Sequence, residues 1–250
     1  MKTFKLLIIN ILLLSTMTLM AKDYKASIFG VKSEGITLNT RSIQKAIDYI
    51  SENGGGRLLF YVGRYQTGTI QLKSNVTIQL EEGAVLVGTT SVYDYFGVNG
   101  TKALIIADNQ ENIGVTGKGV IEGSGAAVLE QINVQIQKGY LKETVAQASP
   151  ALIAMSNCSN ITIDQFNLMN ACGNVLSYIG CKNLTINGVI VKSTAVNGSK
   201  GLVFASCDGI KMTNAYVETS AAELSSAGTS RNVSIVNCKN ASGKNLQATR

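Results

Sequence analysis

Short runs in which apolar and polar residues alternate follow one another along most of the chain. In the run 76–80, Val76, Ile78 and Leu80 fall on one face and the polar residues between them on the other. A period of two residues is the pattern of a β-strand with one buried face. Comparable runs lie at residues 57–62, 67–72, 84–88, 103–106 and 112–115. The chain is therefore predicted to consist mainly of short strands joined by turns.

One phrase of this pattern returns at nearly constant intervals. Cys158, Cys181 and Cys207 each stand two residues before an Asn or Gly that opens an aliphatic strand, and their spacings are 23 and 26 residues. A fourth copy, at residues 230–235, lacks the Cys. A strand-based period of about 20 to 30 residues is typical of a solenoid, either a parallel β-helix or a leucine-rich repeat.

The cysteines of the repeat would stack in such a solenoid at the spacing of neighbouring strands, about 4.8 Å. The chain has five cysteines, so they cannot all pair with one another, and it has no His that could complete a zinc site. We expect buried thiols that act as small apolar side chains, in preference to a disulfide or a metal site. No cofactor is expected.

Two segments depart from the strand pattern. Within residues 39–53, after Asn39 or Thr40 as the N-cap, apolar residues recur at helical spacing, at Ile43, Ala46, Ile47 and Ile50. A helix here would cover the open end of the solenoid. Residues 124–148 also lose the alternation and are expected to form a helical insertion.

The N-terminal residues 1–21 have the pattern of a secretory signal. Lys2 and Lys5 precede an apolar stretch at residues 6–14, and Ala21 offers a small residue for cleavage. The apolar stretch is shorter than the roughly 20 residues that a membrane-spanning helix needs. We expect a secreted or periplasmic chain that is not an integral membrane protein, with the solenoid in residues 22–250.

The charge balance is mildly basic. The chain has 22 Lys and Arg against 16 Asp and Glu, a net charge of +6. It lacks the dense basic tracts of nucleic-acid-binding proteins, so no nucleic-acid partner is expected. The excess suits an acidic polysaccharide, although solubility alone explains it equally well.

The C-terminal part of the chain carries no helix that would cover the last rung. Residues 237–243 read as another turn. Three explanations stay open: the last residues fold back as a cap, a partner or a second copy covers the exposed rung, or the gene is truncated.

Several stretches are similar to one known family. They are residues 29–35, 61–65 and 72–76, then Leu80-Glu81-Glu82-Gly83-Ala84 and Gly117-Lys118-Gly119-Val120-Ile121-Glu122-Gly123. These stretches resemble the polygalacturonases, glycoside hydrolase family 28 of the pectin lyase-like superfamily, most strongly over residues 25 to 125. The resemblance implies an all-β solenoid, a single-stranded right-handed parallel β-helix, and a role in the metabolism of polygalacturonan or rhamnogalacturonan.

The resemblance also implies where catalytic residues should stand. Family members use aspartates on neighbouring rungs, and the inverting reaction needs two carboxyl groups roughly 6.5–9.5 Å apart with a water between them. A Gly-His-Gly turn and an Arg-x-Lys pair follow in the family. The matching positions hold Lys200, Val203, Ala221, Ala222 and Ser242. The resemblance therefore implies a chain without the catalytic residues of the family.

Three functional hypotheses follow from these residues. The first is a non-catalytic protein that binds pectic polysaccharide along the strand face from Pro150 onward, with Lys200, Lys211 and Arg231 as cations for uronates. The second is a truncated relic without activity. The third is an active glycoside hydrolase with displaced acids, for which Glu218, Glu223 and Asp208 are the nearest carboxylates in sequence. A calcium-dependent lyase, with Lys200 as base, is a weaker alternative because the cluster of calcium-binding acids is absent.

Overall fold

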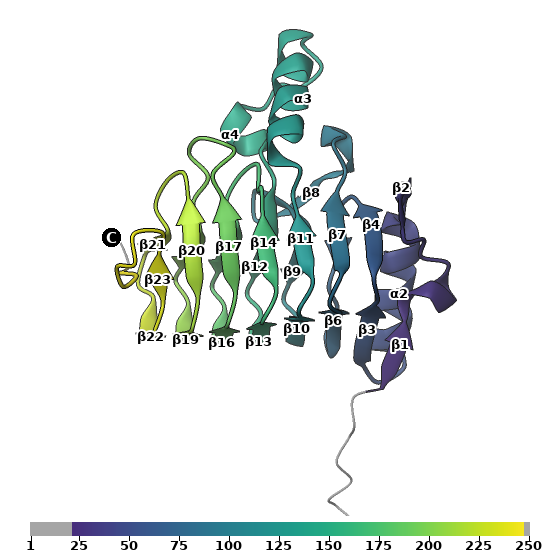
Figure 1. The fold of residues 1–250 in the computed structure, drawn as a ribbon, viewed down its shortest axis with the longest axis horizontal. Helices are drawn as coiled ribbons and strands as arrows, with labels where there is room; N and C mark the ends of the chain where they lie inside the picture. Colours follow the sequence, from purple (N-terminus) through teal and green to yellow (C-terminus); the bar gives the residue numbers. More distant parts are fainter. Residues whose placement is uncertain (1–21, 248–250) are drawn as a thin grey trace, which may run out of the picture.

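The computed structural model describes residues 22–247, so the predicted signal segment 1–21 lies outside the described residues. Residues 22–247 form a parallel β-helix, seen from the side in Figure 1. Successive turns of the solenoid place strands in three sheets, which we call sheets A, B and C. The repeated phrase of the sequence corresponds to one turn of this solenoid.

Each sheet is built from strands that recur along the chain. Sheet A contains β1 (Asp23–Lys25), β3 (Gly56–Phe60), β6 (Val76–Leu80), β10 (Glu111–Gly117), β13 (Ser159–Asp164), β16 (Lys182–Asn187), β19 (Asp208–Thr213) and β22 (Arg231–Val236). Sheet B contains β2 (Glu34–Leu38), β4 (Gly63–Thr67), β7 (Ala84–Gly88), β11 (Val120–Glu122), β14 (Asn167–Met169), β17 (Ile190–Ser193), β20 (Tyr216–Thr219) and β23 (Lys239–Asn240). Sheet C contains β5 (Ile70–Gln71), β9 (Thr101–Asp108), β12 (Ala151–Ser156), β15 (Leu176–Ile179), β18 (Leu202–Ala205) and β21 (Leu224–Ala227), with β8 (Phe96–Val98) antiparallel to β9.

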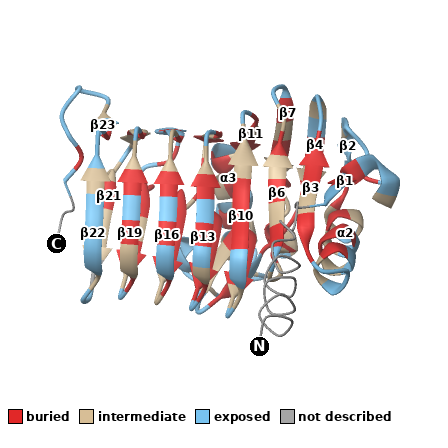
Figure 2. Ribbon diagram, turned by 90° about the horizontal axis from the view of Figure 1, so that it is seen from below, coloured by how far each residue is buried: buried red, intermediate tan, exposed pale blue. Residues whose placement is uncertain are grey.

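The register keeps like residues above one another. In sheet A the pairs Ile161–Leu184 and Leu184–Ile210 lie side by side, and all three side chains are buried. The alternation read from the sequence therefore places one row of each strand inside the solenoid and the next row outside, as the burial colours of Figure 2 show.

The repeated cysteines lie in the core as predicted. Cys158, Cys181 and Cys207 are all buried and their thiols are free. Each thiol lies against backbone carbonyls: Cys181 Sγ donates to Met155 O at 3.4 Å and Cys207 Sγ to Tyr178 O at 3.5 Å. The thiols thus fill the corner of the core where one strand turns into the next.

Asparagines stack on the outside of the same turns. Asn160 Nδ2 donates to Asn112 Oδ1 at 3.0 Å, and Asn183 Nδ2 donates to Asn160 Oδ1 at 3.1 Å. These residues have φ near +55°, a left-handed conformation that Asn tolerates better than most residues. The next position along the row is Gly209 with φ +74°, which explains why the sequence has either Asn or Gly there.

The N-terminal end is covered by helix α2 (Thr40–Glu52), within the range 39–53 that the sequence indicated. The expected face of the helix is buried, at Ile43, Ala46, Ile47 and Ile50. The Asn39 side chain does not cap this helix: its Oδ1 accepts from Lys32 N at 2.7 Å and its Nδ2 donates to Lys32 O at 2.9 Å. Asn39 therefore ties the preceding loop, which follows the short helix η1 (Ala26–Phe29), to the start of α2.

The helical insertion stands off the solenoid near the middle of its length (Figure 1). It consists of α3 (Gly125–Gln137) and the short α4 (Val145–Ala148). The short helix η2 (Val92–Asp94) lies beside it, and Tyr93 Oη donates to Gln135 Oε1 at 2.9 Å. The tip of the β8–β9 hairpin rests on sheet C, where Asn99 Nδ2 donates to Ser156 Oγ.

The C-terminal residues fold back onto the last rung, as in the first of the three explanations that the sequence left open. Lys239 and Asn245 form an antiparallel bridge, and Leu246 N donates to Cys238 O at 2.9 Å. Leu246 is buried against the core. Strand β22 nevertheless remains largely exposed, with Val236 56% exposed (Figure 2), so this hairpin covers only part of the last rung.

Among residues 22–247, no helix combines the length and apolarity that crossing a bilayer requires.

Candidate binding cleft

Of the positions that the family resemblance marks, Val203 lies in sheet C, and Lys200, Ala221 and Ala222 lie in the loops that enter its strands β18 and β21, whereas Ser242 lies apart in the C-terminal hairpin. Leu202 and Phe204 of β18 point into the core, so the intervening Val203 lies on the outer face, between Ser177 and Ser225 of the neighbouring strands. Lys200 lies two residues before β18, and the intervening Gly201 N donates to Ala222 O at 3.0 Å in the next rung. The structure thus brings Lys200, Val203 and Ala222 to one region.

A cleft of about 560 Å³ opens at this leading edge. Its lining comes from four short segments, residues 100–102, 145–147, 172–174 and 196–198, together with Leu129, Ser149, Ala151 and Lys200. The helical insertion therefore forms one wall of the cleft. The β8–β9 turn and the loops that enter β15 and β18 form the others. We call it the insertion cleft.

Buried serines and a glycine fix the loop that carries Lys200. Ser199 is buried, and its Oγ donates to Gly173 O at 2.6 Å in the preceding rung. Gly201 packs so closely on the next rung that a Cβ would stand 2.3 Å from Glu223 O. Lys200, between these two anchored neighbours, is exposed at the cleft. Ser199 and Gly201 therefore fix the backbone on either side of Lys200, and the ammonium group of Lys200 remains exposed to solvent.

The electrostatics of the insertion cleft are one-sided. Lys102 and Lys200 are the ionised side chains in its lining, which contains no carboxylate. Lys102 Nζ lies 2.5 Å from Glu143 Oε2, a carboxylate just outside the lining. Burial raises the pKa of the Cys172 thiol, so this wall of the cleft stays neutral. The arrangement offers hydrogen-bond donors and positive charge to an anionic ligand.

The three carboxylates considered as displaced acids lie in different parts of the solenoid. Asp208 begins β19 in sheet A, where its Oδ1 accepts from Asn232 Nδ2 at 2.7 Å. Glu218 lies in β20 of sheet B and accepts from Tyr216 Oη at 3.1 Å. Glu223 lies in the loop that enters β21. The three carboxylates thus stand on different sheets or edges, and each that has a described partner is held by a hydrogen bond to a neighbouring side chain.

The predicted cations are also divided, which corrects the expectation of one shared binding face. Lys211 and Arg231 lie in β19 and β22 of sheet A, whereas Lys200 lies at sheet C. Arg231 is 3.6 Å from Asp208 and so already has a counter-ion. Alternation along a strand predicts which residues point outward, but it cannot say which of the three sheets a strand joins.

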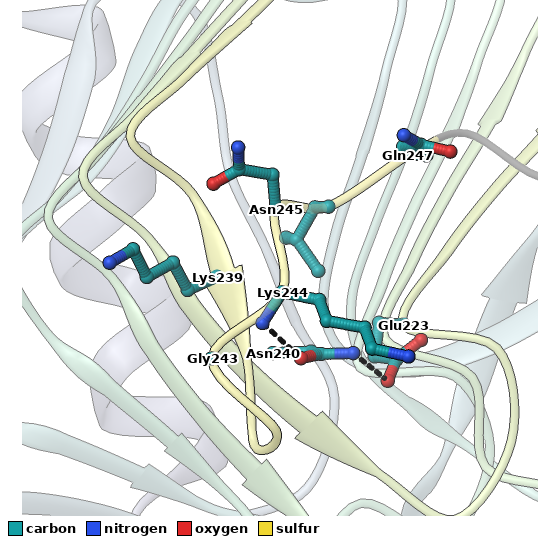
Figure 3. A pocket seen from close by; sticks show the side chains of 8 residues that line it. Glu223, Lys239, Asn240, Gly243, Lys244, Asn245 and Gln247 are labelled. Carbon is teal, nitrogen blue, oxygen red and sulfur yellow. Dashed lines mark hydrogen bonds between the residues drawn. The ribbon is translucent and has the colours of Figure 1, made fainter.

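A second cleft of about 650 Å³ lies at the C-terminal hairpin (Figure 3). Asn240 organises it: its Nδ2 donates to Glu223 Oε1 at 3.2 Å, and its Oδ1 accepts from Ser242 Oγ at 2.9 Å and Lys244 N at 3.0 Å. The side chains of Ser242 and Glu223 are thus both hydrogen-bonded to Asn240 of the hairpin. We take the insertion cleft as the candidate site because Lys200, one of the family-matched residues, lines it.

Sequence reasoning missed Lys102 and the wall formed by α4. The helix start had a readable signal, since Thr144 and Gln147 form a capping box in which Gln147 N donates to Thr144 Oγ1 at 3.3 Å. Lys102 had none, because nothing local shows that a residue near 102 meets one near 143.

Within residues 22–247, no group of three or more His, Cys, Asp or Glu side chains is placed to hold a metal ion.

Comparison with known proteins agrees with the fold. Among solved structures, a "putative glycosyl hydrolase" from Parabacteroides merdae superposes with a TM-score of 0.86 at 51% identity, covering 90% of this chain and 100% of that one. The family 28 exopolygalacturonase of Yersinia enterocolitica gives a TM-score of 0.75 at 20% identity, covering 88% of this chain and 49% of that one.

Sequence comparison gives the family. The exo-poly-alpha-D-galacturonosidase of Dickeya chrysanthemi is 24% identical over 253 aligned residues, 82% of this chain and 42% of that protein. The chain therefore spans less than half the length of this relative. The family model described as Glycosyl hydrolases family 28 matches residues 57–246. The chain belongs to glycosyl hydrolase family 28 and has the right-handed parallel β-helix fold of its polygalacturonase neighbours.

Proposed function

We propose that this chain binds an acidic pectic polysaccharide, polygalacturonan or rhamnogalacturonan, in the insertion cleft without cleaving it. The observation that carries the proposal is the lining of the cleft, which holds Lys102 and Lys200 and no carboxylate. Ammonium groups attract the carboxylates of uronic acids, whereas glycoside hydrolysis requires a carboxyl acid and a carboxylate base. Membership of family 28 supports a polysaccharide as the ligand.

The residues at the family-matched positions support the absence of turnover. Lys200 has three donors and no acceptor when charged, and Val203 and Ala222 carry no ionisable group. None of these side chains can serve as the carboxylate that activates water. Glu223, which follows Ala222 in sequence, accepts a hydrogen bond from Asn240 and lines the other cleft.

The test combines calorimetry with an assay of reducing ends. The protein is titrated with trigalacturonate and with rhamnogalacturonan oligomers, and the same mixtures are incubated to detect new reducing ends. We expect binding without turnover, and binding weakened about two- to fivefold by Lys200→Met. Lys182→Met, which removes an exposed lysine from sheet A, is the matched control and should leave the affinity unchanged.

The outcomes separate the competing hypotheses. Absence of detectable heat with every oligomer would refute binding and favour an inactive relic. Turnover would refute the non-catalytic part of the proposal, and its loss in Glu223→Gln, Glu218→Gln or Asp208→Asn would favour a hydrolase with displaced acids. Turnover that needs calcium would favour a lyase.

Export of the chain, and association through the last rung, remain proposals. Mass spectrometry of the protein from its native host would test cleavage near Ala21. Sedimentation of the mature chain would test whether the exposed strand β22 joins a second copy.

A further inference from the structure

Lys102 lines the insertion cleft, and its ammonium group already has a counter-ion in Glu143. It lies at the start of β9, opposite Gly97 of β8, and lines the cleft. Its side chain is 21% exposed and its Nζ contacts Glu143 Oε2. The ammonium group is thus held in place by the strand pair, partly desolvated and aimed at the helical insertion.

Glu143 is the more solvated partner. It lies between α3 and α4, directly before the N-cap Thr144, and its side chain is 41% exposed. It does not line the cleft, whereas Lys102 does. An ion pair between partly exposed groups is weak and exchangeable, because water and salt compete for both charges. The carboxylate of a uronic acid offers Lys102 the same oxygen ligands as Glu143.

We infer that Lys102 is a second carboxylate-binding residue of the insertion cleft, and that Glu143 acts as its internal counter-ion, which a ligand carboxylate displaces. The inference rests on the proposed function. It adds Lys102 as a ligand-binding residue and Glu143 as an internal competitor of the ligand. Binding then exchanges one ion pair for another at Lys102, while Lys200 gains its ligand without such an exchange.

The exchange of ion pairs also affects α4, which forms part of the wall of the cleft. Glu143 is followed at once by the capping box of α4, whose residues 145–147 line the cleft. Displacement of Glu143 breaks the ion pair between this end of the insertion and β9 as the ligand enters, while α4 itself still packs beside β9. The affinity for ligand is therefore set partly by how strongly Glu143 competes.

The decisive variant is Glu143→Gln, which keeps the shape of the side chain and removes its charge. We expect its affinity for trigalacturonate in low salt to rise about two- to fivefold over the unsubstituted protein, the range set by a partly exposed ion pair. Glu130→Gln removes an exposed carboxylate from α3 in the same insertion and is the matched control. Its affinity should change less than that of Glu143→Gln.

A double-mutant cycle identifies Lys102 as the site of competition. Lys102→Met should weaken binding, and adding Glu143→Gln to Lys102→Met should then give no gain, because the competitor has lost its target. Thermal unfolding of each variant shows whether the fold is intact. A gain in Glu143→Gln that persists without Lys102 would overturn the inference, since it would reflect long-range charge alone.

The inference and the proposed function fail in different ways. If the unsubstituted protein and Glu143→Gln both give no heat with trigalacturonate, the proposed function fails and this inference with it. If the unsubstituted protein binds and Glu143→Gln binds equally well or more weakly, only the inference is overturned.

Discussion

The ring of Tyr178 stacks on that of Phe204 in the next rung, with centroids 5.8 Å apart and planes inclined by 19°. Both rings are buried in the core, and the Tyr178 hydroxyl has no hydrogen-bond partner there. Stacked aromatic rings stabilise neighbouring turns of the solenoid. The buried, unpaired hydroxyl of Tyr178 lowers the stability that the stacking provides, because it has lost its hydrogen bonds to water.

Tyr178→Phe should therefore stabilise the protein. Removing the hydroxyl relieves the desolvation of an unpaired polar group, worth about 1–3 kcal/mol, and keeps the stacked ring. Urea unfolding at neutral pH measures the change. Tyr65→Phe is the comparison, because the Tyr65 hydroxyl donates to Tyr61 O and its removal should destabilise. A loss of stability in Tyr178→Phe would contradict the assignment of an unpaired hydroxyl.

Stability should fall in alkaline solution. Burial raises the pKa of Tyr178, Tyr95 and Cys172 in the folded chain above their values in the unfolded one. Below the unfolded values, about 8.5 for Cys and about 10 for Tyr, both states are protonated and this contribution is fully present. Above them the unfolded chain loses protons first, so the free energy of unfolding decreases as pH rises towards the folded values.

Urea unfolding at several pH values between about 7.5 and 11 tests this prediction. Tyr178→Phe provides the control, because it removes one of the raised groups and should give a shallower decline. A free energy of unfolding that stays constant over this range would contradict the prediction.

Gly201→Ala should disturb the loop that carries Lys200. A Cβ at this position would stand 2.3 Å from Glu223 O, so the backbone of one rung must move. We expect a loss near the upper end of the about 1–3 kcal/mol typical of overpacking, and weaker binding of trigalacturonate. Gly198→Ala in the same loop meets no atom within 4 Å and carries only the cost of its φ of +85°. Equal losses in the two variants would show that the close approach is not what matters.

Leu246→Ala should expose the end of the solenoid. Leu246 is buried against the core although it comes from the C-terminal hairpin. Truncating a buried leucine costs about 2–5 kcal/mol, and this site should fall at the lower end because the hairpin lies at the end of the solenoid. Faster hydrogen exchange confined to β22 and β23 would accompany the loss. Unchanged exchange in these strands would show that the hairpin does not cap them.

The strands and their repeat could be read from the sequence because they depend on local rules. Alternation at Val76, Ile78 and Leu80 needs only a pleated chain with one buried face, and the α2 pattern needs only a helix with one buried side. The stacked row of Cys158, Cys181 and Cys207 followed from their spacing, since a solenoid repeats its geometry at each turn.

The site could be read only in part. The resemblance directed attention to Lys200 and Val203, and the structure places both at sheet C. The three predicted cations were expected on one face, but each turn of the solenoid visits three sheets, so Lys211 and Arg231 lie on sheet A. Outward direction is a local property, whereas membership of a face depends on where the chain bends.

The sequence by itself thus determined a β-solenoid with a helix at its N-terminal end and buried thiols inside, because period and polarity are written residue by residue. Only the tertiary structure decided which charges share a cleft. Lys102 meets Glu143, and shares a cleft with Lys200, because the α4 end of the insertion packs beside β9. Contacts between segments about 40 and 100 residues apart in sequence arise from packing and leave no local pattern in the chain.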